Sequence, residues 1–152
     1  NYNSPGQIVI AGNREAVDRA CALATEAGAR RAIPLAVSVP SHCALMAPAA
    51  EAMAAALEDV EIAPCRIPVL HNVDTQARDD ADGIRSALVQ QLSQPVRWAA
   101  TVARLAEKGA LNMAECGPGK VLTGLNRRIS REITSSALIS ADAIGNTLEN
   151  WS

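Results

Sequence analysis

Aromatic side chains are nearly absent from this sequence of 152 residues. It contains no phenylalanine, and its aromatic residues are Tyr2, Trp98 and Trp151. The core must therefore be packed with Ala, Val, Leu and Ile, and hydrophobic residues make up 49% of the chain. That share, beside 20% charged residues, is typical of a globular chain rather than a disordered one. A chain of this length can form one domain with a real core.

The sequence also lacks a basic excess, a long apolar run and paired cysteines. The formal net charge of -2 argues against nucleic-acid binding, which needs a basic field. No run approaches the roughly 18 apolar residues of a membrane span, and no signal peptide is visible. The cysteines form neither a CxxC pair nor a metal-ligand spacing. We therefore expect a cytoplasmic protein with reduced thiols, and no metal, nucleic acid or membrane among its partners.

Strands and helices alternate in the predicted order of elements. Apolar runs predict strands at 7–11, 33–39, 67–72, 112–116 and 133–139. Helical spacing predicts helices between Asn13 and Gly28, at 41–57, 83–93, 96–108 and 120–131, and a short one ending near Glu149. Pro48 falls inside the second helix, where we expect a kink or a restart. This alternation predicts an α/β layer architecture with parallel pairing.

His42 is the first candidate for chemistry, because it lies where the predicted strand at 33–39 passes into the next helix. Open α/β sheets place functional groups at such junctions, and histidine is a frequent acid or base. A surface or capping histidine is the alternative interpretation. Cys43 is expected to be a small buried hydrophobe, because adjacent helical residues do not face one another. His71, near another strand end, is expected to be structural.

Gln91 lies seven residues after Ile84, so it falls on the inward face of its predicted helix. Burying its amide without a partner would cost about 1–3 kcal/mol. The amide could bond a histidine ring nitrogen and fix the tautomer of that ring, as an orienting group does in a nucleophile–histidine pair. It could equally bond neighbouring backbone. The sequence leaves both interpretations open.

Three further patterns are weaker. Residues 115–120 superficially resemble a phosphate loop, but Ala114 and Val121 stand where the Walker pattern needs glycine and Ser or Thr. We expect a tight strand-to-helix turn there, whose backbone N–H groups could still line a site. The chain contains no GxSxG, so it has no nucleophile elbow of the hydrolase type. Short arginine clusters at 30–31 and 127–131 could dock an acidic partner if they lie together.

Five motifs in order carry a resemblance to a known family. They are NYNSPGQIVIAG, PLAVSVPSHCALM, HNVD, QLSQPVRW and ECGPGKVLTGLNRRI. Together they closely resemble the malonyl-CoA:acyl-carrier-protein transacylases of bacterial type II fatty-acid synthesis, over nearly the whole chain. The VPSHCALM form resembles the stand-alone enzymes. Acyltransferase domains of modular polyketide synthases usually show a different tetrapeptide ending at the histidine.

The resemblance implies a ping-pong acyl transfer that needs no bound cofactor. A serine in a GHSxG motif takes malonyl from coenzyme A and passes it to the phosphopantetheine thiol of acyl carrier protein. His42 is then the general base, and Gln91 orients it through its main-chain carbonyl rather than through its amide. Asn1 and Asn3 lie near the substrate cleft in this family. The basic surface that receives the carrier protein includes Arg30, Arg31, Arg127 and Arg128.

The resemblance also implies that important parts precede Asn1. The GHSxG serine, the arginine that pairs with the malonyl carboxylate and the oxyanion segment have no counterpart in this sequence. We therefore expect the C-terminal half of the enzyme, inactive alone, with the N-terminal half as a partner. Residues 1–39 would form the later part of a ferredoxin-like small subdomain, and 40–152 the end of an α/β-hydrolase-like large subdomain. A carrier-binding fragment without activity, or part of a polyketide synthase, are the alternatives.

Overall fold

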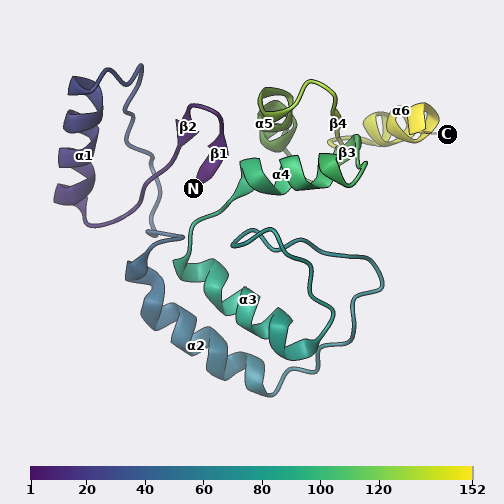
Figure 1. The fold of residues 1–152 in the computed structure, drawn as a ribbon, viewed down its shortest axis with the longest axis horizontal. Helices are drawn as coiled ribbons and strands as arrows, with labels where there is room; N and C mark the ends of the chain where they lie inside the picture. Colours follow the sequence, from purple (N-terminus) through teal and green to yellow (C-terminus); the bar gives the residue numbers. More distant parts are fainter. Residues whose placement is uncertain (152) are drawn as a thin grey trace. The chain divides into compact units, whose positions relative to one another are not determined.

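The computed structural model describes residues 1–151, which form two compact units. The first unit contains Asn1 and Val9–Val96, and the second contains Tyr2–Ile8 and the chain from Arg97 onward. In the first unit the elements are α1 (Arg14–Glu26), the 3-10 turn η1 (Ala44–Met46), α2 (Ala47–Glu58) and α3 (Ala81–Ser93). In the second they are β1 (Tyr2–Ser4), β2 (Gln7–Ile8), α4 (Trp98–Glu107), β3 (Asn112–Glu115), α5 (Val121–Ile129), β4 (Thr134–Ala137) and α6 (Ala141–Trp151), all labelled in Figure 1.

Helices α2 and α3 pack side by side in the first unit (Figure 1). The seven alanines and few bulky groups of APAAEAMAAALE let the two backbones approach, and Ala50, Ile84 and Ala87 are buried between them. Arg85 stabilises the end of α2, because its Nε and Nη2 donate to the carbonyls of Leu57 (3.0 Å) and Val60 (2.7 Å). The Leu57 carbonyl lies in the last turn of α2, where carbonyls lack the helical partner four residues later, and Val60 follows the helix. Packing against α2 therefore holds α3 in place, including its C-terminal turn.

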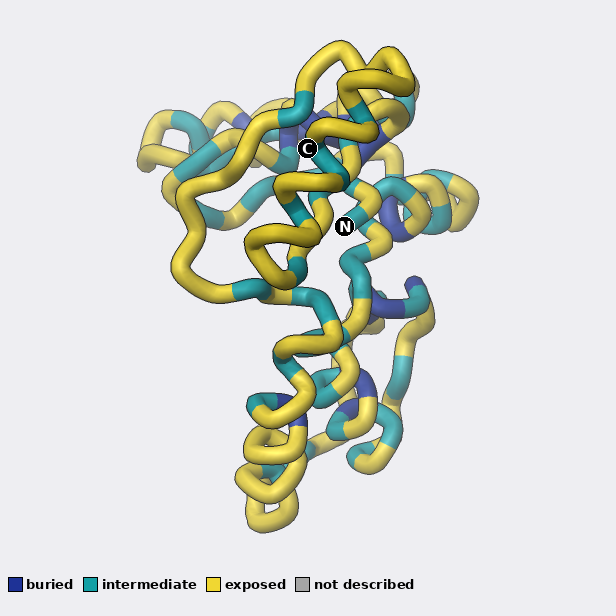
Figure 2. The backbone as a smooth tube through the Cα atoms, turned by 90° about the vertical axis from the view of Figure 1, so that its left-hand side faces the viewer, coloured by how far each residue is buried: buried dark blue, intermediate teal, exposed yellow. Residues whose placement is uncertain are grey.

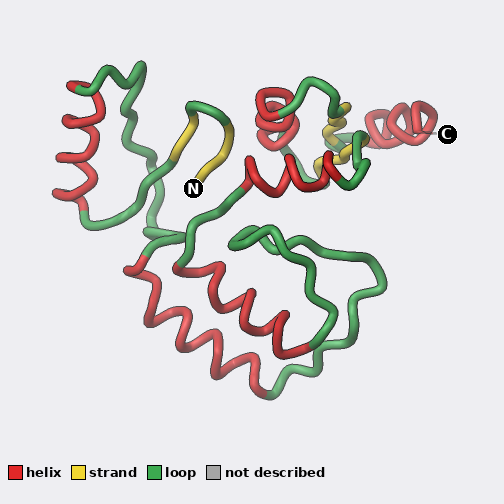
Figure 3. Tube along the Cα trace, in the orientation of Figure 1, coloured by secondary structure: helices red, strands yellow, loops and turns green. Residues whose placement is uncertain are grey.

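The connection between α2 and α3 is irregular (Figure 3), and one tight loop in it is strongly bonded. The expected strand at 67–72 is wrong, because only a single bridge, from Leu70 to Ala77, forms there. The backbone N–H of His71 donates to the Gln76 carbonyl (2.9 Å), and Thr75 N–H donates to the His71 carbonyl (2.8 Å). Asp74 forms an ion pair with Arg78 that closes the loop. His71 is thus mounted on a locally fixed backbone.

Two expectations for the segment before α2 are wrong. Residues 33–39 form no strand, and Ile33, Leu35 and Val37 are 62%, 57% and 70% exposed. A strand needs a neighbour to bond, and among residues 1–151 none pairs with this segment. The expected helix from Ser41 begins only with η1 and α2. Pro48 stands in the first turn of α2, where a missing N–H costs nothing, so of the expected kink or restart the structure shows the restart, with η1 before it and α2 beginning at Ala47.

The second unit contains a parallel strand pair joined by a helix. Strands β3 and β4 pair in parallel from Asn112 opposite Thr134 to Glu115 opposite Ala137, and α5 connects them. The amide of Asn126 on α5 donates to Ser135 Oγ (3.0 Å) and accepts from Trp98 Nε1 (3.1 Å), which ties two helices to β4. This unit confirms the α/β class. The predicted division into subdomains at 1–39 and 40–152 stays a prediction.

Buried residues are few in both units, as the scarce dark blue segments of Figure 2 show. In the second unit the buried hydrophobic side chains are Val102, Leu125 and Ile133. Large apolar side chains remain exposed, among them Ile67 (76%) and Val121 (70%). Within residues 1–151, no helix combines the length and the apolar character that crossing a membrane requires.

Candidate active site

His42 lies in the turn before η1 and not in a helix, and its backbone adopts a left-handed φ of 64°. That conformation costs a residue with a Cβ about 1–2 kcal/mol, so the surroundings must enforce it. Two bonds to the end of α3 do so. The His42 backbone N–H donates to the Leu92 carbonyl (3.0 Å), and Nδ1 lies 2.7 Å from the Gln91 carbonyl oxygen. A carbonyl can only accept, so Nδ1 carries the hydrogen and Nε2 of the neutral ring keeps its lone pair.

Pro95 explains why the Gln91 carbonyl is available. In a continuing helix this carbonyl would accept from the N–H four residues later. Position 95 is proline, which has no N–H, and α3 ends at Ser93. The bond from Gln94 N–H to the Gln90 carbonyl (2.9 Å) is the last of the helical series. The proline therefore leaves a carbonyl at the helix end for the histidine.

Asn1 completes the same helix end. The N–H of Val96 would be the helical partner of the Leu92 carbonyl, which instead accepts from His42. Val96 N–H donates to Asn1 Oδ1 at 3.3 Å. The structure thus places Asn1 beside the segment that follows Gln91. Asn3 lies half-buried in β1, in the second unit.

The amide of Gln91 reaches a second histidine. Its Nε2 lies 3.3 Å from Nδ1 of His71, whose side chain is buried. Within the described part of the chain, the buried Nε2 of His71 has no hydrogen-bond partner. Burial and then the Arg78 charge lower the pKa of His71 below its ordinary 6.5, against a raising effect of Asp74. His71 is therefore neutral at pH 7, and sequence reasoning missed its contact with Gln91 because 20 residues separate the two.

The predicted docking arginines are exposed, and the structure distributes them over both units. Arg30 and Arg31 follow α1 in the first unit, whereas Arg127 and Arg128 belong to the last turn of α5 in the second. Arg128 Nη1 donates to Gln7 Oε1 at 2.7 Å. Their assembly into one basic surface stays a prediction. Cys43 is half-buried, and its thiol donates to the Pro40 carbonyl at 3.1 Å, which agrees with a structural role.

The glycine-rich segment at 115–120 has a clear structural role. Glu115 accepts from the N–H groups of Leu122 (3.1 Å) and Thr123 (2.8 Å) and from Thr123 Oγ1 (2.8 Å). Burial raises the pKa of Glu115, but these donors outweigh burial and lower it overall. The carboxylate occupies the helix N-terminus at which a phosphate loop would hold its anion. This finding explains why the segment is a capped turn.

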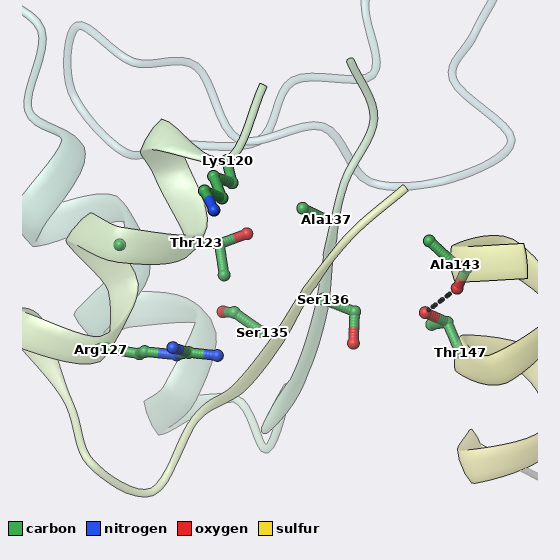
Figure 4. Close-up of a pocket in the computed structure, with 9 residues that line it drawn as sticks. Lys120, Thr123, Arg127, Ser135, Ser136, Ala137, Ala143 and Thr147 are labelled. Atoms are coloured by element: carbon green, nitrogen blue, oxygen red, sulfur yellow. Dashed lines mark hydrogen bonds between the residues drawn. The ribbon is translucent and has the colours of Figure 1, made fainter. Parts of the chain in front are cut away.

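A cleft of about 610 Å³ opens in the second unit between α5, β4 and α6 (Figure 4). Lys120 and Arg127 supply positive charge at its rim, and Ser136 and Thr147 supply hydroxyl groups. Neither His42 nor Gln91 lines it. Among residues 1–151, no cluster of three or more His, Cys, Asp or Glu side chains could hold a metal ion. The oriented histidine of the first unit is therefore the stronger candidate for chemistry.

An α/β chain with a histidine tied at Nδ1 and free at Nε2 has the features of the base-bearing part of a group-transfer enzyme. Comparison with known sequences agrees: the model of the acyl transferase domain family matches residues 1–146, and the chain belongs to that family. It is 60% identical over 129 residues to the malonyl CoA-acyl carrier protein transacylase of Haemophilus influenzae, covering 85% of this chain and 41% of the relative. The Escherichia coli K12 protein of the same name is 51% identical over 149 residues, covering 98% and 48%.

Solved structures show the same likeness. A malonyl-transacylase in complex with a type II PKS acyl-carrier protein superposes with a TM-score of 0.97 at 51% identity, over 99% of this chain and 48% of that one. The transacylase from Streptococcus pneumoniae gives a TM-score of 0.92 at 37% identity, over 99% and 49%. The chain thus spans about half the length of the relatives it matches.

Proposed function

We propose that this chain provides the general base and its orienting helix for malonyl transfer from coenzyme A to acyl carrier protein. The observation that carries the proposal is the bond between His42 Nδ1 and the Gln91 carbonyl (2.7 Å). It fixes the ring with Nε2 free to accept a proton. The relatives are named for malonyl transfer between these two carriers, which supplies the reaction and its substrates.

The reaction proceeds by acyl exchange at a serine that another part of the enzyme supplies. His42 Nε2 takes the serine hydroxyl proton while the oxygen attacks the thioester carbonyl of malonyl-CoA. The C–S bond breaks, and the coenzyme A thiolate leaves with the proton from His42. The phosphopantetheine thiol then gives its proton to His42 and attacks the malonyl-serine ester, whose C–O bond to serine breaks as the malonyl thioester forms. The serine recovers that proton, and no redox cofactor or metal is needed for the balance.

The part that supplies the serine is the first partner in this proposal. The chain spans about half the length of its relatives, and it exposes the apolar alternation of Ile33, Leu35 and Val37. Extended apolar segments without a neighbour are completed by another strand or a covering surface. We infer that an N-terminal portion of the enzyme covers this surface and brings its nucleophile to His42. We also propose, from the family resemblance, that a boundary after Val39 separates the small subdomain from the large one.

The second partner is the acyl carrier protein. One structurally similar malonyl-transacylase is in complex with an acyl-carrier protein, and the exposed Arg30 and Arg31 suit an acidic ligand. Exposed arginines chiefly steer and orient such an encounter. Arg127 and Arg128 are the second cluster in this proposal. The carrier of that complex belongs to a type II PKS, so a polyketide carrier is an alternative recipient for the same reaction.

The experiment joins the 152-residue chain behind the N-terminal portion of the Escherichia coli relative, the part outside its match. We call this the joined protein. It should transfer radiolabelled malonyl from malonyl-CoA to phosphopantetheinylated carrier protein. The 152-residue chain alone should not. Replacing His42→Ala should lower kcat by about 10²–10⁴-fold, the usual contribution of a general base.

Two outcomes would contradict the proposal. One is a folded joined protein, verified by circular dichroism, that transfers no malonyl. The other is a His42→Ala variant as active as the unchanged protein. Cys43→Ala serves as the matched control, because Cys43 is adjacent and its thiol donates to the Pro40 carbonyl.

A further inference from the structure

A buried histidine that the proposed reaction does not use requires an explanation. His71 is only 6% exposed, and its Nε2 is buried without a partner among the described residues. Burying an unpaired polar group in this way is costly, so apolar side chains would serve packing better. The other ring nitrogen of His71 makes one contact, with the amide of Gln91 at 3.3 Å. That residue also orients His42.

Gln91 connects the two histidines through different atoms. Its carbonyl accepts from His42 Nδ1, and its amide nitrogen lies against Nδ1 of His71. Because Pro95 has no N–H, no helical bond fixes the direction of this carbonyl. The Gln91 carbonyl lies in the last turn of α3, where helices fray, so a bond from the side chain of the same residue adds a restraint. The bond to His71 supplies that restraint through the Gln91 side chain.

The loop that carries His71 is held rigidly enough to restrain the Gln91 side chain. Its backbone N–H and carbonyl are bonded to Gln76 (2.9 Å) and Thr75 (2.8 Å), and Asp74 pairs with Arg78 across the same loop. Thr75 holds a left-handed φ of 64°, which such a bonded loop can sustain. The ring therefore has a fixed position from which to hold a flexible glutamine side chain.

We propose that His71 is a positioning residue of the acyl transfer: it holds the Gln91 side chain and thereby aims the Gln91 carbonyl at His42 Nδ1. This inference rests on the proposed malonyl transfer. The contact requires a lone pair on Nδ1 of His71 and a hydrogen on its Nε2. The two histidines thus adopt opposite tautomers, with His42 carrying its hydrogen on Nδ1. Burial and the Arg78 charge, which lower the pKa of His71, keep it in the neutral form that accepts.

The test compares two substitutions of His71 in the joined protein. His71→Leu keeps an apolar volume but has no acceptor, whereas the Oδ1 atom of His71→Asn can stand where Nδ1 stood. We expect His71→Leu to lower kcat by roughly 10- to 100-fold, since small misplacements of catalytic groups cost about that much. The KM for malonyl-CoA should stay within about twofold, because no substrate contact is lost. His71→Asn should recover kcat to within about threefold of the unchanged protein.

Gln91→Met provides a second route that leaves the buried histidine in place. It removes the amide but retains the backbone carbonyl, so it should reproduce the kcat loss of His71→Leu. The double variant should lose little more than either single one, because both changes break the same contact. Equal kcat for His71→Leu and His71→Asn, or fully additive losses, would overturn the inference.

A spectroscopic arm separates this inference from the proposed function. In nitrogen-15 NMR spectra the His42 Nδ1–H should be protected from exchange in the joined protein and in His71→Asn. It should exchange rapidly in His71→Leu. If the unchanged joined protein transfers no malonyl, the proposed function fails, yet this signal still tests the positioning. A His42 Nδ1–H equally protected in His71→Leu would refute the role of His71 whatever the activity.

Discussion

Two helix ends in this molecule are completed by a side chain from elsewhere, and they differ in what remains free afterwards. At the end of α3, the carbonyls of Gln91 and Leu92 accept from His42. At the start of α5, the N–H groups of Leu122 and Thr123 donate to Glu115. The helix end uses only one ring nitrogen of His42 and leaves Nε2 available. The carboxylate of Glu115, in contrast, is committed to three donors.

The contrast shows how a candidate for chemistry differs from a polar residue that only completes a helix end. Both residues satisfy backbone groups that a helix cannot satisfy itself. Only His42 keeps a strained backbone, with φ of 64°, and an unused acceptor on the same residue. Strain that the surroundings enforce is common at functional sites. The Glu115 arrangement instead matches ordinary capping, in which a carboxylate meets the positive end of a helix.

Among the substitutions that would remove the difference between the two helix ends, Pro95→Ala should have the largest effect on kcat. The new N–H at position 95 can bond the Gln91 carbonyl, so the helix recovers the acceptor that His42 uses. We expect kcat of malonyl transfer in the joined protein to fall roughly 10- to 100-fold. Its thermal midpoint should stay equal or rise, because a helical bond has been gained. Steady-state transfer assays and calorimetry measure the two quantities.

Pro48→Ala is the matched control for that substitution. Pro48 lies in the first turn of α2, where an added N–H finds no helical carbonyl to take. It should leave kcat unchanged. A Pro95→Ala protein with normal kcat and a protected His42 Nδ1–H would show that the proline does not create the site.

The sequence predicted those parts of the two helix ends that depend on neighbouring residues, and missed those that depend on residues far apart in the chain. Local patterns sufficed for α3, α5 and the inward face of Gln91, which the structure confirms. The supposed strand at 33–39 failed because a strand depends on a neighbour that no local pattern supplies. The left-handed backbone of His42 was equally hidden, since it is enforced by Gln91 and Leu92, 49 and 50 positions away. Periodicity could indicate His42 as a candidate but not what holds it.

A smaller effect is expected at the structural helix end. Glu115→Gln removes the charge that α5 and its donors favour, so the thermal midpoint should fall. The kcat per folded molecule should not change, because both carboxylate oxygens of Glu115 are bonded to the start of α5. Glu107→Gln is the control: it lies at the last position of α4, where the negative helix end does not favour a carboxylate. A loss of kcat in Glu115→Gln without loss of stability would contradict the structural assignment.

The pH dependence of this difference has a definite sign. The folded pKa of Glu115 lies below its ordinary 4.5, because the N–H and hydroxyl donors outweigh the raising effect of burial. Its stabilising contribution is therefore present above pH 4.5 and is lost as the pH falls through the lowered folded value. Urea melts of the unchanged protein and of Glu115→Gln should differ at pH 7 and converge in stronger acid. Curves that diverge further in acid would contradict this.

The smallest expected effect concerns His71. Its contribution also makes the protein less stable as the pH falls, but here because the folded state disfavours the charged form instead of favouring it. Its folded pKa is lowered by burial and by Arg78, so the unfolded chain binds the proton more readily. The neutral ring is fully compatible with folding above pH 6.5, and stability should fall as the pH drops below that value. His71→Asn cannot titrate and should flatten the decline measured by urea melts of the joined protein between pH 7.5 and 5.5. An unchanged slope would mean that protonated His71 is tolerated in place, and that its contact with Gln91 does not depend on a neutral ring.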